Sequence, residues 1–211
     1  LRREPGDEGR SDAGLRCGLE RLHGCARAPR AALELLVEAG CDVNQANKDG
    51  ATPAHAAAHQ GQTATLERLI KAGCDVNQAQ NDGKTPTYVA AEKGQTAALE
   101  LLVGAGCDVN QAIGNGATPA FAAAWKGHAA ALEVLDKAGC DVNKAKMNGV
   151  TPAFVAAQEG QAAALELLVE AGCLVNKANK DGATPAHAAA HQGQTATLER
   201  LIKAGCDVNQ A

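Results

Sequence analysis

Residues 49–77 decide the fold, and they read DGATPAHAAAHQGQTATLERLIKAGCDVN. The Asp-Gly pair at the start of this stretch is a turn signal. Thr52 is a favourable N-cap, and Pro53 is preorganised for the first position of a helix. A short helix is therefore predicted from Pro53 to about Gln60, and Gly61 is expected to end it.

A second helix is predicted over residues 63–72. Leu66, Leu69 and Ile70 recur at helical spacing, so they share one apolar face. Gly73 supplies the left-handed residue that ends such a helix. The Cys-Asp-Val-Asn stretch that follows is predicted to leave the helix as an extended segment.

This pair of helices recurs every 33 residues along the chain. The Thr-Pro pair begins at residues 52, 85, 118, 151 and 184, and the Gly-Cys pair at 40, 73, 106, 139, 172 and 205. Full units are predicted at 47–79, 80–112, 113–145, 146–178 and 179–211, with 17–46 as a degenerate first unit. A unit this small cannot bury its apolar face alone, so we predict an all-α solenoid of about six helix-turn-helix units joined by short extended turns.

The units resemble the ankyrin-repeat family. The residues that carry this resemblance are Thr52-Pro53-Ala54-His55, Ala57-Ala58, Gly61-Gln62, Leu69-Ile70 and Gly73-Cys74-Asp75-Val76-Asn77. The resemblance covers roughly residues 47–211 strongly and 18–46 weakly. It implies an ankyrin-repeat solenoid that binds another protein on the concave face, with its turn tips and the exposed side of its first helices.

Several positions depart from the family's pattern. The usual Leu after Thr-Pro is a small residue here: Ala54, Thr87, Ala120, Ala153 and Ala186. We expect the rings at the next position, Tyr88, Phe121 and Phe154, to refill part of that volume, and the units with His to be softer. Asp136 interrupts the apolar stripe of its helix, where it either reaches solvent, destabilises the helix or has a functional role.

Both ends of the chain lead to expectations about its context. Residues 1–16 are charged and Gly-rich, lack the apolar core of a signal peptide and do not begin with Met, so we expect a flexible lead-in to a fragment. Residues 179–211 repeat 47–79 letter for letter. Such a last unit has no specialised outer face and should expose apolar helix surface, so we expect the natural protein to continue beyond Ala211.

The composition limits the classes of partner. The chain has 20 basic and 24 acidic residues and a net charge of -4, without a basic stripe, so a nucleic-acid partner is not expected. No run of about 18 apolar residues exists, so no membrane span is expected. Free thiols are typical of a reducing compartment, so we expect an intracellular protein, in the cytoplasm first and the nucleus as the alternative.

The candidate chemical groups favour structural roles over catalysis. Six of the cysteines share one repeat position. Adjacent helices are too far apart there for a disulfide, and the thiols do not converge on a metal. These six cysteines are therefore interpreted as small buried hydrophobic residues. Cys17 and Cys25 stay undetermined. His55 and His59 could share a metal, but no third ligand is evident, and the resemblance implies a structural role for His55. No catalytic motif is present, so we expect no enzyme activity, cofactor or metal.

The resemblance places candidate protein-binding residues at the turn tips and on the first helices. They are Lys48, Asp49, His59 and Gln60; Asn81, Asp82, Lys84, Glu92 and Lys93; Asn115, Trp125 and Lys126; Met147, Asn148, Val150, Gln158 and Glu159; and Lys180, Asp181, His191 and Gln192, together with Ala51, Gly114, Ala117 and Ala183. These positions vary between units while the framework does not. Trp125 is either an interface hot spot, with Met147 and Val150 one unit along, or an ordinary exposed ring.

A smaller hypothesis concerns Asn44, Asn77, Asn110 and Asn143. With a Leu eight residues earlier, as in Leu69 and Asn77, they resemble the substrates of an asparagine hydroxylase; the alternative is a purely structural turn residue.

Three functions remain open at this point. The first is a non-catalytic scaffold that binds a protein. The second is the targeting arm of a larger enzyme, such as a kinase or a ubiquitin-ligase adaptor, whose catalytic domain lies outside this chain. The third is an elastic spacer. The fold alone does not choose the partner.

Overall fold

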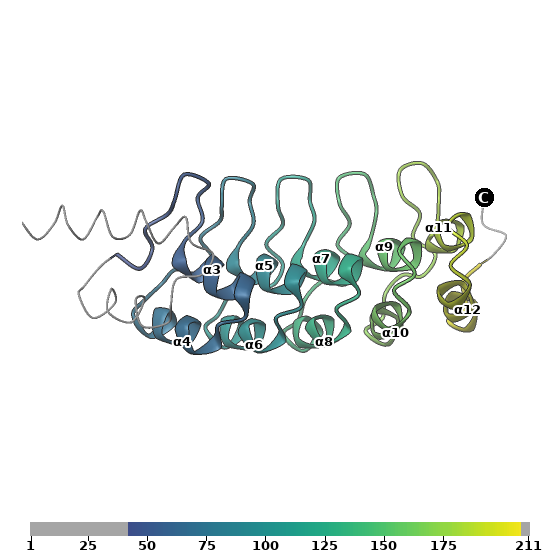
Figure 1. Ribbon diagram of the computed structural model, residues 1–211. Helices are drawn as coiled ribbons and strands as arrows, with labels where there is room; N and C mark the ends of the chain where they lie inside the picture. Colours follow the sequence, from purple (N-terminus) through teal and green to yellow (C-terminus); the bar gives the residue numbers. More distant parts are fainter. Residues whose placement is uncertain (1–41, 208–211) are drawn as a thin grey trace, which may run out of the picture.

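The computed structural model describes residues 42–207, in which ten α-helices form five pairs (Figure 1). The first helices of the pairs are α3 (Pro53–Gln60), α5 (Pro86–Lys93), α7 (Pro119–Lys126), α9 (Pro152–Gln158) and α11 (Pro185–His191). The second helices are α4 (Thr63–Lys71), α6 (Thr96–Gly104), α8 (Ala129–Lys137), α10 (Ala162–Glu170) and α12 (Thr195–Lys203). The lead-in at 1–16 and nearly all of the degenerate unit at 17–46 lie outside the described residues.

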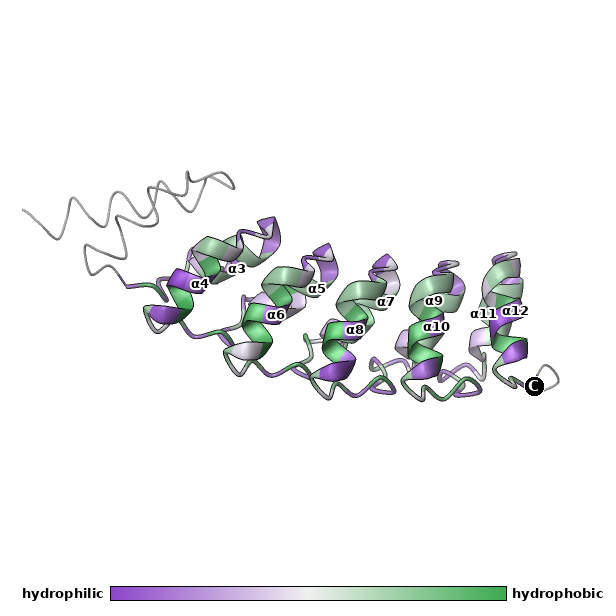
Figure 2. Ribbon diagram, turned by 90° about the horizontal axis from the view of Figure 1, so that it is seen from below, coloured by the Kyte–Doolittle hydropathy of each residue, from purple (hydrophilic) through white to green (hydrophobic). Residues whose placement is uncertain are grey.

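The helices form two rows. Each first helix packs against the first helix of the next pair, and each second helix packs likewise against the next second helix. Figure 1 shows the loops between pairs projecting together beyond the first helices, and Figure 2 shows the second helices side by side. The expected all-α solenoid is confirmed for the described part of the chain, because each pair is covered by its neighbours as the repeat requires.

The Thr-Pro pairs begin the first helices as expected. Thr85 Oγ1 accepts the Tyr88 N–H at 3.1 Å, and Thr118 and Thr151 accept equivalent bonds. In α3 a histidine takes part in the cap: His55 Nδ1 accepts the Thr52 N–H at 3.1 Å. These bonds satisfy backbone donors that a helix start leaves without partners.

The core runs the length of the described array and is built of Leu and Ala. Leu66, Leu99 and Leu135 are fully buried, and alanines line the contacts between first helices. Tyr88, Phe121 and Phe154 are buried too, as expected of rings that fill space beside small residues. Asp136 is exposed, so its carboxylate reaches solvent.

Hydrogen bonds from asparagine side chains join each unit to the next. Asn77 Oδ1 accepts the Asp108 N–H at 2.8 Å, and Asn110 and Asn143 accept from the residues 31 positions further on in the same way. Asn44 and Asn176 continue this ladder at either end. The asparagines of the Asp-Val-Asn stretch therefore hold neighbouring units in register.

Thr87 places a buried hydroxyl in helix α5 at a position where the other units have alanine. Its Oγ1 forms no hydrogen bond with a nitrogen or oxygen of the described residues, and it has a polar contact with the thiol of Cys107, a weak hydrogen-bonding group. Thr87→Val keeps the volume and removes this poorly satisfied hydroxyl, so we expect the free energy of unfolding to rise by about 1 kcal/mol. Urea denaturation followed by circular dichroism measures this change, and an unchanged or lower midpoint would show that the hydroxyl is satisfied in solution.

Candidate functional site

The predicted binding residues lie on one surface, which we call the tip–helix surface. The exposed residues are Lys48, Asp49, His59, Asn81, Asp82, Lys93, Asn115, Trp125, Lys126, Met147, Asn148, Glu159, Lys180, Asp181, His191 and Gln192. Gln60, Lys84, Glu92, Val150 and Gln158 are partly exposed. Ala117 corrects the sequence-based prediction: it is buried at the base of its loop, where its carbonyl accepts the Ile113 N–H, so it offers a partner no surface.

The turn tips are held by hydrogen bonds between neighbouring loops. The Asn81 N–H donates to the Asp49 carbonyl at 3.0 Å, the Met147 N–H donates to Asn115, and the Lys180 N–H donates to Asn148. Within a tip, Asn or Asp side chains accept nearby backbone N–H groups, as Asp82 does from Lys84 at 3.0 Å. These bonds fix the first two tips relative to each other, and likewise the last three, before any partner arrives.

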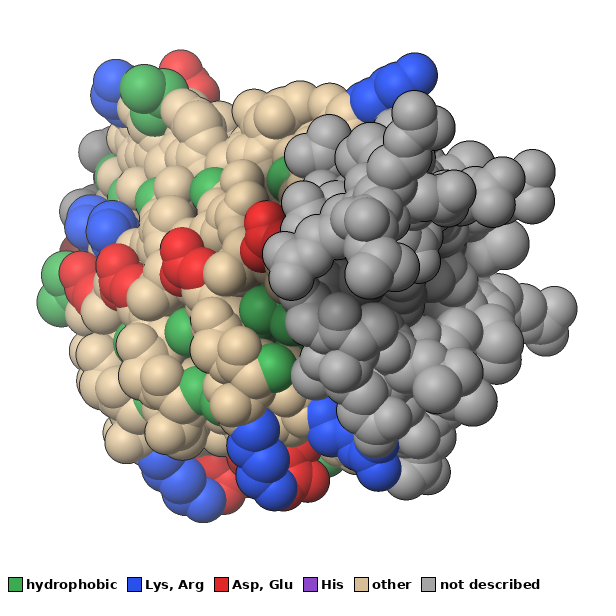
Figure 3. Space-filling view, turned by 90° about the vertical axis from the view of Figure 1, so that its left-hand side faces the viewer, with side chains coloured by type: hydrophobic (Ala, Val, Ile, Leu, Met, Phe, Trp, Pro, Cys, Tyr) green, Lys and Arg blue, Asp and Glu red, His purple; other side chains and the backbone are tan. Residues whose placement is uncertain are grey.

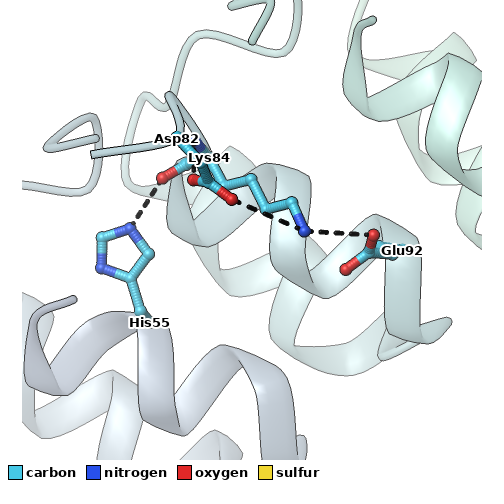
Figure 4. Close-up of polar contacts among 4 residues, drawn as sticks. All are labelled: His55, Asp82, Lys84 and Glu92. Atoms are coloured by element: carbon cyan, nitrogen blue, oxygen red, sulfur yellow. Dashed lines mark hydrogen bonds and ion pairs between the residues drawn. The ribbon is translucent and has the colours of Figure 1, made fainter. Parts of the chain in front are cut away.

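Figure 4 shows a cluster where one tip meets helix α5. Lys84 Nζ lies 3.4 Å from Glu92 and 3.7 Å from Asp82, and it stands 5.7 Å from the centre of the Tyr88 ring. The Lys84 and Glu92 side chains are mostly buried, so this ion pair is better shielded from solvent than the pairs on the second helices. Burial raises the pKa of Tyr88 to about 12, with Glu92 and Asp82 adding to the rise. The ring is therefore neutral, and Glu92 is neutralised by Lys84.

His55 joins this cluster from the preceding unit. Because Nδ1 accepts the Thr52 N–H, the proton is assigned to Nε2, which donates to the Lys84 carbonyl at 3.0 Å. Burial lowers the pKa of His55, although the Lys84 carbonyl and Asp82 act against this. A neutral His55 with both ring nitrogens engaged has a structural role, as the resemblance implied, and it offers no metal ligand beside His59.

Trp125 forms the apolar centre of the tip–helix surface. Its side chain is 40% exposed, and Lys126 Nζ lies 4.0 Å from the centre of its ring. One unit along, Met147 at the tip is 70% exposed. Lys146 covers the Phe121 ring at 5.0 Å. An exposed indole with a cation over its face can bind an apolar group and a negative charge together.

The second helices carry exposed charged side chains that form ion pairs with one another. Lys71 Nζ lies 2.7 Å from Glu67, and Lys137 Nζ lies 2.7 Å from Glu133, each one helical turn apart. Arg200 pairs with Glu166 of the preceding second helix. Figure 3 shows basic and acidic side chains together along the lower edge, where Figure 1 places the second helices. The charges of these pairs neutralise each other, and solvent-exposed pairs of this kind contribute little to stability.

The cysteines lie at one repeat position, as predicted, but they are only half-buried rather than buried. Cys74, Cys107, Cys140, Cys173 and Cys206 are free thiols at the ends of the second helices, where the left-handed glycine turns the chain outward. Burial raises the pKa of Cys140 to about 11, with Asp136 and Asp141 adding to the rise, and burial raises that of Cys173 to about 11. Cys17 and Cys25 lie outside the described residues.

These raised pKa values predict slow alkylation. At pH 8 only about 0.1% of a thiol with such a pKa is thiolate, against roughly a quarter of an unperturbed cysteine. We expect iodoacetamide to modify Cys140 and Cys173 roughly 100-fold more slowly in the folded protein than in urea, and the rate to rise about tenfold per pH unit from pH 8 to pH 10. Peptide mass spectrometry measures each rate; equal rates in the folded and unfolded protein would contradict the assignment.

Residues 42–207 contain neither a candidate metal site nor a candidate membrane span. No group of three or more His, Cys, Asp or Glu side chains there could hold a metal ion. None of the helices in that range is long and apolar enough to cross a membrane.

The comparisons with known proteins agree with the repeat. A family model described as ankyrin repeats (3 copies) matches residues 22–113 and again residues 120–211. No curated protein matches the chain significantly. Both matches together cover most of the sequence. The chain therefore belongs to the ankyrin-repeat family.

Proposed function

We propose that this chain is a non-catalytic module that binds a protein partner on the tip–helix surface. Ankyrin repeats are generally protein–protein interaction modules and typically non-catalytic. A stack of identical frameworks gives a long, ordered surface on which a few variable side chains determine what is bound.

One observation supports the choice of surface: the helix-capping threonines and the buried leucines of the second helices repeat between units, whereas the exposed positions of the tips and first helices change. A position near the end of each first helix is the clearest example, since it holds His59, Glu92, Trp125, Gln158 and His191. The buried threonine that begins each first helix is the same in all five described pairs. Packing does not fix the residues at these exposed positions, which leaves them free to determine the partner that is bound.

Trp125 is the residue on which we expect binding to depend most. Trp125→Ala removes an exposed ring from the centre of the surface, and the loss should weaken partner binding by at least about 2 kcal/mol, roughly 30-fold in the dissociation constant. Isothermal titration of a purified partner with both proteins measures the loss.

The control for this experiment is Lys71→Ala on helix α4, which removes an exposed side chain from the second helices. It should leave partner affinity unchanged. A partner that binds Trp125→Ala as tightly as the wild type would remove Trp125 from the site, and a partner lost only in Lys71→Ala would move the site to the other edge.

A further inference from the structure

The residues at the C-terminal ends of the first helices form a row that crosses the array and carries three charges in its middle. At this repeat position stand Gln60, Lys93, Lys126, Glu159 and Gln192. The order is neutral, positive, positive, negative and neutral along five units. The two cations and the anion all lie exposed, next to or within one unit of Trp125.

These charges have no partners within the described part of the chain. The ion pairs there involve Lys71, Lys84, Lys137 and Arg200, and neither Lys93, Lys126 nor Glu159 takes part in one. Lys126 lies over the Trp125 ring, a contact that leaves its charge without a carboxylate. The cations of this row are therefore available to a partner, unlike Lys71 and Lys137 on the second helices.

Glu159 distinguishes two explanations of this row of charges: recognition of a partner and stabilisation of the helix ends. A cation near a helix C-terminus interacts favourably with the helix dipole, so Lys93 and Lys126 could be explained by local stability. Glu159 is the C-cap of α9, a helix with no basic residue in its last turn, so its charge is unfavourable there. A residue that breaks a local rule without a compensating contact indicates a role outside the fold.

The spacing of the row fits a polyproline II backbone. Packed helices lie about 8–10 Å apart, so the row should present one charge about every 8–10 Å. A polyproline II segment has three residues per turn and rises about 3.1 Å per residue, which places every third side chain on one face at about 9 Å. A β-strand alternates its faces, so its third side chain would point away.

We propose that the tip–helix surface binds an extended protein segment with acidic side chains at two positions three residues apart and a basic side chain three residues further. The acidic side chains pair with Lys93 and Lys126, and the basic side chain pairs with Glu159. An apolar side chain of the same segment, between these charged residues, packs on Trp125. This inference rests on the proposed function and adds the chemistry of the partner.

The test uses the full chain and a displayed library of random 12-residue peptides. Peptides that bind the wild type should be enriched in the acidic, acidic, basic spacing, read in either chain direction. The variant that reverses all three charges, Lys93→Glu/Lys126→Glu/Glu159→Lys, should enrich the opposite pattern. Circular dichroism establishes that each variant is folded, and Glu159→Lys alone should be at least as stable as the wild type because it corrects the charge at a helix end.

Affinities of synthesised peptides make the comparison quantitative. A selected peptide should lose at least tenfold in affinity for Lys93→Glu/Lys126→Glu, and its charge-reversed version should prefer the triple variant. The matched control, Lys71→Glu/Lys137→Glu, makes the same change in net charge on the second helices and should leave affinity unchanged.

Each other outcome overturns the inference in a recognisable way. Peptides that depend on Trp125 but ignore the three charges would leave the proposed function standing and remove the charge pattern. Binding that ignores both Trp125 and the charges would remove the proposed surface as well. If the wild-type chain sediments as a dimer and the Trp125→Ala variant as a monomer, the occupant of the surface is a second copy of the chain.

Discussion

Replacing Leu135 by Ala is expected to lower the free energy of unfolding by about 3 kcal/mol, within the range measured for buried Leu-to-Ala changes. Leu135 is fully buried on helix α8, with pairs packed on both sides. The loss combines the transfer free energy of the side chain with the cavity that a stiff, Ala-rich surrounding cannot close. Because α8 lies in the middle of the described array, the change should also separate unfolding into two transitions, since the units on either side no longer stabilise each other.

The matched control is Leu201→Ala, at the same repeat position on helix α12. Leu201 is equally buried, but among the described residues α12 packs against a neighbouring second helix on only one side. We expect its loss to melt the last pair early and to leave the main transition near that of the wild type. Urea titration followed by circular dichroism distinguishes the two cases. A single transition with equal shifts in both variants would show that the array unfolds as one unit.

Local sequence signals were sufficient to predict the described helices. Thr52 and Pro53 determine where α3 begins, and Gly61 ends it with φ +65°, because each acts on its own backbone. The period of 33 then extends this local result to every unit. What the repeat predicts well is therefore what depends on a residue and its near neighbours in the sequence.

Contacts between units were harder to predict, because their atoms belong to residues about one repeat apart. The bond from His55 to the Lys84 carbonyl and the ladder from Asn77 to the Asp108 N–H have this character. The period could have suggested them, since a polar side chain that recurs in every unit needs a recurring partner. Among the described units, the pair of Lys84 with Glu92 occurs in one, and no periodic signal marks it.

For the tip–helix surface, the sequence predicted the position, whereas the structure was needed to show which charges are available. Its position followed from the resemblance, and its residues are exposed or partly exposed, with Ala117 as the exception. The character of the surface depended on the structure, because pairing decides which charges are available: Glu92 is neutralised by Lys84, whereas Lys93 beside it has no such partner in the described part. Glu92 and Lys93 are thus adjacent in the sequence, but of the two it is Lys93 whose charge is available to a partner.

Gly94→Ala is expected to cost about 3 kcal/mol, and the cause is packing between units as much as backbone strain. Gly94 ends helix α5 at φ +68°, and a Cβ there would lie 2.6 Å from His128 Nδ1 and 2.8 Å from His128 Cγ of the next unit. Because Cγ is the ring atom nearest the backbone of His128, a small shift of the far end of the ring does not relieve the contact. The whole ring must rotate away. Left-handed strain of about 1–2 kcal/mol and overpacking of about 1–3 kcal/mol act together here.

The sequence-matched control separates these two causes. Gly193 holds the same repeat position at φ +69°, but a Cβ there meets nothing within 4 Å, so Gly193→Ala should show the strain alone, about 1–2 kcal/mol. Gly106→Ala, at φ +82° with equally open space, repeats that control inside the array and excludes an effect of fraying at the last pair. Denaturation midpoints of the three variants measure the difference. If Gly94→Ala cost no more than Gly106→Ala, close approach of the following unit would not be what requires glycine at the end of the first helix, and the account of how the units pack would need revision.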